Sequence, residues 1–441
     1  MVYWRKYSMT RRMKDSGIEW IGDIPKKWKV VKLSNIFKER KVKNKGNIET
    51  NVLSLSYGSI KKRNVETNMG LLPANFETYN IIENGNIVLR LTDLQNDHKS
   101  LRCGLVNERG IITSAYVTLE KTVDIDSNYY YRLLHTFDIM KGFYGMGEGV
   151  RQSLKFDGEL KRLLLVMPCV NEQKQIADYL DKKCTKIEQT IEKEKQLIEK
   201  LKEYKQSVIT EAVTKGLNPN VKMKDSGVEW IGEIPEHWKA IKVKHMCNLN
   251  GRIGWQGLTS AEYKEEGPYL ITGTDFKNGR IDWNTCVHIT EERYEEAKQI
   301  QIRNGDLLIT KDGTIGKVAI VSSLDGKASL NSGVLLIRPI KRDLYIIKFM
   351  YYVLLSQVFW MWFESTKTGN STIIHLYQEK FKEFSYALPL LEEQKQIADY
   401  LDKKCSSIDK LISNKEKLIE KLTEYKKSLI YECVTGKREI R

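Results

Sequence analysis

Basic and amide side chains near expected loops are the groups in this sequence whose chemistry could recognise a ligand. Arginine and lysine hold phosphates, arginine also reads guanine, and asparagine or glutamine reads adenine in the major groove of DNA. Any one of them is more often a solvated polar group, so the prediction rests on their gathering in two stretches of the chain. The candidate DNA-binding residues are Lys61, Lys62, Arg63, Arg90, Lys99, Arg102, Arg151 and Gln152 in the first stretch, and Arg252, Gln256, Lys277, Asn278, Arg280, Lys311, Lys367, Asn370 and Ser371 in the second.

The overall charge favours the same chemistry. The 441 residues carry 72 Lys and Arg against 57 Asp and Glu, which gives a net charge of +15. A basic surface of this size attracts polyanions, of which nucleic acid is the commonest. No apolar run reaches the length of a membrane span, and the N-terminus lacks the apolar core of a signal peptide. We therefore expect a cytoplasmic protein.

Sequence motifs of catalysis are missing. The stretch "DGTIGKV" (312–318) contains Gly-Lys without the spacing of a P-loop, and no Asn-Pro-Pro-aromatic tetrapeptide of an amino-methyltransferase occurs. The six histidines are scattered, and the seven cysteines form no CxxC pair. We expect a chain that is not itself an enzyme and binds neither a metal nor a cofactor.

Two blocks of the sequence occur twice. "MKDSGIEWIGDIPKKWK" (13–29) returns as "MKDSGVEWIGEIPEHWK" (223–239) with 13 of 17 letters unchanged, and "EQKQIADYLDKKC" (172–184) returns unchanged at 393–405. The first block returns after 210 residues and the second after 221, so the segments between them differ in length as well as in sequence. This pattern indicates two similar frames around two different recognition segments. We expect four tryptophans of the first block to pack it down, namely Trp20, Trp28, Trp230 and Trp238.

Each copy of the second block opens a long amphipathic helix. Apolar residues at alternating spacings of four and three form the a/d seam of a coiled coil. A rod with one narrow apolar stripe needs a partner, so we expect the two copies to pair, antiparallel about a pseudo-two-fold axis. The predicted interface consists of Leu180, Ile187, Ile191, Glu194, Ile198 and Leu201 in the first copy, and Leu401, Ile408, Ile412, Lys415, Ile419 and Leu422 in the second.

Glu194 and Lys415 occupy equivalent polar positions in this seam. Glu194 lies near the middle of its helix, where a two-fold axis would bring it close to its counterpart. One hypothesis is a pair that fixes the register of the helices. The alternative is two ordinary solvated charges.

The segments between the blocks indicate mixed structure with β-rich cores. Runs such as "GDLLITKDGTIGKVAIV" (305–321) and "GVLLIRPI" (333–340) are typical of short strands, whereas residues 343–366 favour a buried helix. The expected fold class is α/β (α+β), with two globular recognition domains separated by two long antiparallel helices. The predicted divisions are an N-terminal extension (1–12), a first recognition domain (13–171), a central helix (172–215), a second recognition domain (216–392) and a C-terminal helix (393–441).

The repeated motifs resemble those of the DNA-specificity subunits of type I restriction-modification systems. They are Trp-Ile-Gly-(Asp/Glu)-Ile-Pro-x-x-Trp at 20–28 and 230–238, and Glu-Gln-Lys-Gln-Ile-Ala at 172–177 and 393–398. The resemblance covers nearly the whole chain. Since it begins near Met13, we expect deletion of residues 1–12 to leave DNA recognition unchanged.

The resemblance implies a non-catalytic subunit in which each of two target-recognition domains reads half of a split site in double-stranded DNA. It also implies partners: two methylation subunits that use S-adenosylmethionine, and motor-nuclease restriction subunits that use ATP and magnesium. An alternative from another class is a coiled-coil adaptor protein with non-specific DNA binding. A third is a stand-alone enzyme, which the missing motifs argue against.

Overall fold

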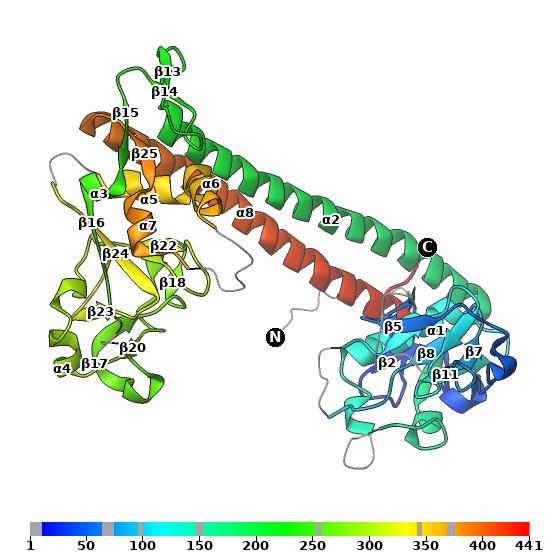
Figure 1. Ribbon diagram of the computed structural model, residues 1–441. Coiled ribbons are helices and arrows are strands. Elements are labelled where there is room, and N and C mark those ends of the chain that lie inside the picture. Colours follow the sequence, from blue (N-terminus) through cyan, green and yellow to red (C-terminus); the bar gives the residue numbers. More distant parts are fainter. Residues whose placement is uncertain are drawn as a thin grey trace. The chain divides into compact units, whose positions relative to one another are not determined.

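The computed structural model of the chain describes residues 11–63, 75–95, 100–146, 153–252, 254, 257–341, 346–367 and 375–440. The chain forms two compact units, and each takes in part of both long helices (Figure 1). Unit 1 comprises Met1–Glu194 and Lys417–Arg441, and unit 2 comprises Lys195–Glu416. The predicted fold class, mixed α/β with β-rich cores and long helices, is confirmed. The domain boundaries predicted from the sequence divide the chain into consecutive segments, and they stay predictions.

Unit 1 is built on short antiparallel strands packed against one helix. Its largest sheet has the order β4-β11-β8-β9, and α1 packs beside β9. The side chain of Asp126 caps α1 by accepting a hydrogen bond from the Tyr129 N–H, and the apolar face of the helix is fully buried. The elements are β1 (Met13–Asp15), β2 (Asp23–Pro25), β3 (Lys29–Lys32), β4 (Phe37–Glu39), β5 (Leu53–Ser56), β6 (Ser59–Lys62), β7 (Asn80–Ile82), β8 (Ile87–Leu89), β9 (Cys103–Leu105), β10 (Gly110–Ile112), β11 (Val117–Lys121), α1 (Ser127–Ile139) and β12 (Leu164–Met167).

Unit 2 has the larger sheets. One has the order β16-β24-β21-β22, and another has the order β20-β17-β23, in which β17 and β23 run parallel. Strand β21 is buried throughout because its run of apolar residues lies inside the sheet. The elements are β13 (Met223–Asp225), β14 (Glu233–Pro235), β15 (Lys239–Lys242), α3 (Val243–Met246), β16 (Cys247–Gly251), β17 (Lys264–Ile271), β18 (Phe276–Lys277), β19 (Arg280–Ile281), β20 (Val287–His288), α4 (Glu291–Glu295), β21 (Leu307–Thr310), β22 (Val318–Ile320), β23 (Ala328–Leu330), β24 (Val334–Pro339), α5 (Ile347–Leu355), α6 (Gln357–Ser365), α7 (Gln378–Lys382) and β25 (Ser385–Leu388).

The two long helices are α2 (Val170–Lys215) and α8 (Leu391–Val434). Within unit 1, Arg11 bonds both Glu172 at the start of α2 and the Gly436 carbonyl just beyond the end of α8. The helix segments of unit 1 therefore run antiparallel. The same holds in unit 2, where Trp238 contacts both Glu393 at the start of α8 and Gly216 just beyond the end of α2.

An ion pair links the two helices within each unit. Lys426 bonds Glu188 in unit 1, and Lys205 bonds Asp409 in unit 2 at 2.7 Å. The partners are related by the same shift of 221 residues that relates the two copies of "EQKQIADYLDKKC". The two units therefore repeat one helix register, including one ion pair.

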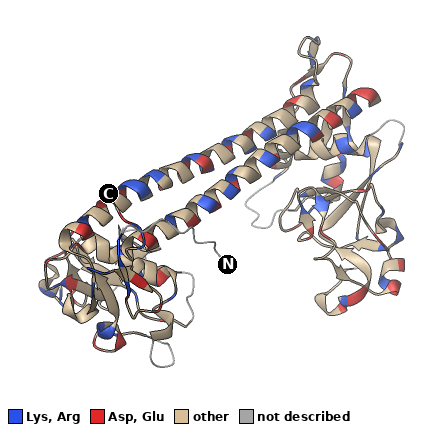
Figure 2. Ribbon diagram, turned by 180° about the vertical axis from the view of Figure 1, so that it is seen from behind, with Lys and Arg blue, Asp and Glu red and all other residues tan. Residues whose placement is uncertain are grey.

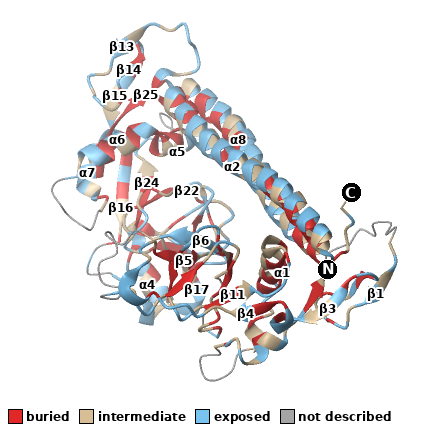
Figure 3. Cartoon of the chain, turned by 90° about the vertical axis from the view of Figure 1, so that its right-hand side faces the viewer, coloured by how far each residue is buried: buried red, intermediate tan, exposed pale blue. Residues whose placement is uncertain are grey.

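The predicted seam residues are all buried or half-buried, between faces that are largely exposed (Figure 3). Glu194 and Lys415 are half-buried, and the boundary between the units falls beside them in both helices. Their mutual contact stays a prediction.

The first repeated block packs as the sequence predicts. Trp28 and Trp238 are each 1% exposed, and Trp20 and Trp230 pack partly buried against the cores of their units. The indole N–H of Trp28 donates to Glu172 at 2.8 Å, and that of Trp238 donates to Glu393 at 3.2 Å. A glutamate in the first turn of each long helix, Glu172 or Glu393, thus anchors the repeated block to its unit.

Candidate nucleic-acid interface

Eleven of the predicted DNA-binding residues can be placed, and they range from exposed through half-buried to buried. Six lie outside the residues that the structure describes, namely Lys99, Arg151, Gln152, Gln256, Asn370 and Ser371. Those six stay predictions.

Arg102 is a correction. Its side chain is buried (0% exposed), and the guanidinium donates to the carbonyls of Arg90, Thr92 and Asp93 and to the Tyr144 hydroxyl. A guanidinium committed to main-chain carbonyls in this way holds the loop after β8 in place rather than meeting DNA. The prediction of a direct contact is wrong for Arg102.

Arg252 needs the same correction. Its side chain is 5% exposed and donates to the Leu330 carbonyl at 2.8 Å and to the Ser329 hydroxyl at 3.0 Å. Burial lowers the pKa of Arg252 from its ordinary value. No feature of the local sequence distinguishes these two arginines from exposed ones, because their acceptors come from other loops and strands.

In unit 1 the remaining candidates lie on a hairpin and the strand end beside it. Lys61 and Lys62 are exposed on β6, which pairs with β5, and Arg63 is half-buried with its N–H donated to the Val52 carbonyl. Arg90 is half-buried after β8, where the Arg102 guanidinium bonds its carbonyl. Three cationic side chains thus follow one another along a single edge.

In unit 2 the hairpin of β18 and β19 displays three of the candidates. Asn278 and Gly279 form its two-residue turn with φ of 49° and 75°, as a tight turn with both central residues left-handed requires. Lys277, Asn278 and Arg280 are exposed around this turn. Lys277 also pairs with Asp282 at 2.5 Å, so a phosphate would have to compete with that carboxylate.

The loop between β21 and β22 gathers further polar groups. The N–H of Lys311 donates to the Gly333 carbonyl, and the Lys311 carbonyl accepts from the Leu376 N–H. This pairing brings together three segments of unit 2 that are distant in sequence. Lys367 is exposed after α6, where its ammonium lies over the Phe363 ring and pairs with Glu364. Asp312, His375 and Tyr377 also lie here, and the sequence did not single them out.

Residues 235–424 match the family model for the Type I restriction modification DNA specificity domain. That part of the chain is similar to this family. The resemblance predicted from the repeated motifs is thereby confirmed.

Similarity to known specificity subunits extends over most of the chain. The chain is 26% identical to the type I restriction enzyme MjaVIII specificity subunit of Methanocaldococcus jannaschii, over 95% of this chain and 94% of that one. It is 27% identical to the EcoBI specificity subunit of Escherichia coli, over 60% of this chain and 57% of that one.

Solved structures show the same fold. One, from work on complex assembly and conformational transition of the type I R-M system, has a TM-score of 0.70 at 15% identity and covers 94% of this chain and 99% of that one. The HsdS subunit from Thermoanaerobacter tengcongensis has a TM-score of 0.54 at 15% identity, covering 94% and 98%.

Beyond their seam, the long helices expose apolar side chains at repeat-equivalent positions. Leu197 and Tyr204 of α2, in unit 2, are 40% and 49% exposed. Leu418 and Tyr425 of α8, in unit 1, are 40% and 48% exposed. Lys and Arg lie along the same helices, interspersed with Asp and Glu (Figure 2). Each unit therefore carries one copy of the same apolar patch.

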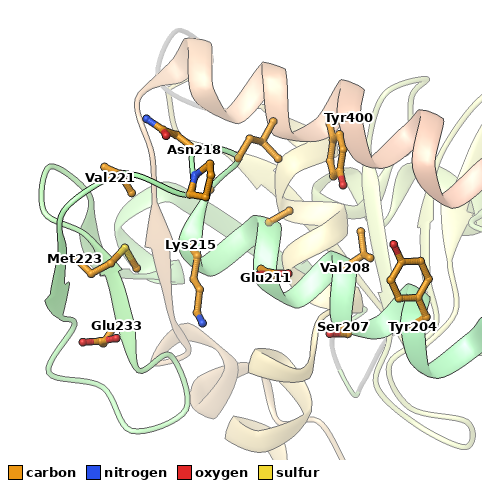
Figure 4. A pocket seen from close by; sticks show the side chains of 14 residues that line it. Tyr204, Ser207, Val208, Glu211, Lys215, Asn218, Val221, Met223, Glu233 and Tyr400 are labelled. Carbon is orange, nitrogen blue, oxygen red and sulfur yellow. The ribbon is translucent and has the colours of Figure 1, made fainter. Parts of the chain in front are cut away.

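The patch in unit 2 continues into a cavity of about 670 Å³ at the end of α2. Tyr204 of α2 and Tyr400 of α8 face each other at one side of it, and Lys215, Met223 and Glu233 lie toward the other (Figure 4). The walls mix apolar and polar side chains, and the carboxylates of Glu211 and Glu233 among them would repel a phosphate, so the cavity suits a protein side chain or helix better.

Buried titratable groups elsewhere have structural causes. Burial raises the pKa of the Cys286 and Cys433 thiols to about 12, which keeps both in the unreactive thiol form. Among the described residues, no three His, Cys, Asp or Glu side chains gather as a metal site would require. Within the same residues, no helix combines the length and apolar character needed to span a bilayer.

Proposed function

We propose that this chain is the sequence-specificity subunit of a type I restriction-modification enzyme and reads a bipartite, asymmetric DNA site. The observation that carries the proposal is one frame built twice around different loops. The helix register, the ion pair and the tryptophan anchor recur in both units, whereas the basic loops do not. Two similar frames that carry different loops are suited to two different half-sites, one read by each unit.

The chain has a non-catalytic role in this proposal and works in the cytoplasm, where it directs partner subunits to the site. Similarity to specificity subunits over 95% of the chain supports this role. Two methylation subunits supply adenine methylation with S-adenosylmethionine, and motor-nuclease subunits supply cleavage with ATP and magnesium.

The repeated apolar patches support two equivalent docking sites for the methylation subunits. Equal exposure of Tyr204 and Tyr425, at 49% and 48%, is what two copies of one partner would require. Replacing Leu197 and Tyr204 by glutamate should lower the number of bound methylation subunits from two to one. Replacing the matched pair, Leu418 and Tyr425, by glutamate should likewise leave one bound methylation subunit. All four substitutions together should abolish assembly.

The decisive experiment is a map of methylated adenines in cells with and without this protein. A bipartite motif that depends on the chain supports the proposal. Exchange of residues 240–392 for those of another specificity subunit should then change one half-site only. An unchanged motif after the exchange, or weak binding to all DNA that falls steeply with salt, would favour the adaptor alternative.

Helix length offers a second test. Seven residues inserted at equivalent points of α2 and α8 lengthen each helix by about 10 Å, the length of about three base pairs. The unread gap between the half-sites should grow accordingly while both half-sites stay the same. A gap that does not change would show that the helices do not set it.

A further inference from the structure

Asp312 and His375 form a polar pair on the surface of unit 2. Nδ1 of His375 lies 2.5 Å from Oδ1 of Asp312, although the two residues are 63 positions apart. Because a carboxylate oxygen can only accept, the shared proton belongs to the imidazole Nδ1. The imidazole therefore fixes the orientation of the carboxylate.

Hydrogen bonds between distant segments hold the main chain around the pair. Lys311 donates its N–H to Gly333 at 2.8 Å, and its carbonyl accepts from Leu376 at 2.9 Å, so the residues directly before Asp312 and after His375 are joined. Strands β21 and β24 place Thr310 opposite Val334, which brings residues 311 and 333 to the same end of the sheet. A site on such a support keeps its geometry before a ligand arrives.

The pair remains open to a ligand. The side chains of Asp312 and His375 are 35% and 39% exposed. Among the described residues, Oδ2 of Asp312 has no hydrogen-bond partner. Gly333 has no positive φ that would demand glycine, and a Cβ there would lie 3.9 Å from Oδ2. The missing side chain at residue 333 thus leaves one side of the carboxylate uncovered.

The surroundings suit nucleic acid. Tyr377 is 57% exposed with its ring 5.8 Å from that of His375, and Lys380 lies over the Tyr377 ring at 5.9 Å. The negative charge of Asp312 would repel the phosphates of a DNA backbone nearby. The carboxylate would therefore weaken DNA binding unless it accepted a hydrogen bond from the DNA. The exocyclic amino groups of cytosine and adenine are the donors that a carboxylate accepts from in the major groove.

We propose that Asp312 is a specificity-determining residue of unit 2, accepting a hydrogen bond from an exocyclic amino group of cytosine or adenine, and that His375 is its positioning residue. This inference rests on the proposed function. To that function the inference adds the residue that reads one base pair, and the chemical class of base that this residue reads.

The experiment compares Asp312→Asn with the control Asp325→Asn. Both substitutions remove one negative charge from unit 2, and Asp325 is an exposed residue in the loop between β22 and β23, at the opposite end of β22. Any general gain in electrostatic attraction to DNA should therefore be the same in both variants. The full-length proteins first select from random duplexes, and their affinities are then measured on the selected site with all four bases at each position.

For the wild-type chain we expect discrimination of roughly 5- to 150-fold in favour of the amino-bearing base at one position of one half-site. The amide of Asp312→Asn donates as well as accepts, so this discrimination should fall below about threefold or invert. His375→Ala should weaken discrimination at that same position. The other half-site, the Asp325→Asn protein and the thermal stability of all variants should match the wild type.

Identical base preferences for Asp312→Asn and Asp325→Asn would overturn the inference. So would a loss of affinity for every sequence alike, since that indicates a structural role. If the wild-type chain selects no bipartite sequence, the proposed function itself fails, and that result is distinct from either of the others.

Discussion

Replacing Arg102 by methionine tests whether this arginine supports the loop after β8 in unit 1 or touches DNA. The change keeps most of the side-chain volume but removes the donors to the carbonyls of Arg90, Thr92 and Asp93. A buried acceptor left without a partner costs about 1–3 kcal/mol. Three such losses, partly relieved by movement of the loop or by entering water, should lower the free energy of unfolding of unit 1 by about 3–5 kcal/mol.

Hydrogen exchange of the full-length protein measures this loss unit by unit. Peptides from 100–146 should exchange faster in the variant, whereas peptides from β21 to β24 in unit 2 should be unchanged. Arg102→Lys is the matched control: it keeps the charge but loses the planar fork, so its loss should be intermediate. Unchanged exchange in unit 1 combined with weaker binding to the first half-site would refute the reasoning and restore Arg102 as a direct contact.

Three further predictions concern the frame of the molecule. Burial, helped by the positive charges of Lys426 and Arg132, lowers the pKa of His135 from 6.5 to about 4, so stability present above pH 6.5 is lost as the pH falls toward 4. The loss should reach about 2 kcal/mol at pH 5 in the exchange of unit 1, and it should vanish in His135→Leu. Arg11→Ala should lower the stability of unit 1 by about 1–2 kcal/mol while leaving the methylation motif unchanged; a changed motif would show that the N-terminal extension takes part in recognition. Lys205→Ala should cost unit 2 less than about 1 kcal/mol, because its partner Asp409 is largely exposed, and a larger loss by urea unfolding would contradict that assignment.

The frame could be predicted from the sequence because its signals are local and occur twice. Seam residues at spacings of four and three fix a helix face whatever else the chain does. The tryptophans of the repeated block also pack as expected. Large aromatic side chains bury much apolar surface, and the long helix that recurs together with the block provides a surface for them to pack against.

The candidate interface could be predicted only in part. Lys277, Asn278 and Arg280, expected near a loop, do lie exposed around the turn between β18 and β19, where Asn278 and Gly279 readily adopt the left-handed conformation. Arg102 and Arg252 were misjudged because their acceptors lie on carbonyls that only the tertiary fold brings near. The pairing of Asp312 with His375 could not be predicted for the same reason, since it depends on loops joined by sheet register.

The ends of the two long helices show that packing, more than chain order, defines a unit. Gly216 and Gly436 end the helices with φ of 76° and 74°, and each lies against the tryptophan of a repeated block, Trp238 or Trp28. After Gly216 the chain continues directly into its block, whereas the block that meets Gly436 lies at the far end of the sequence. In unit 1, where the chain supplies no such link, Arg11 bonds the Gly436 carbonyl and Lys437 bonds the carbonyl of Ile21. Side-chain hydrogen bonds therefore hold in unit 1 a junction that the backbone makes in unit 2, so two equivalent frames arise from one chain with its ends in the same unit.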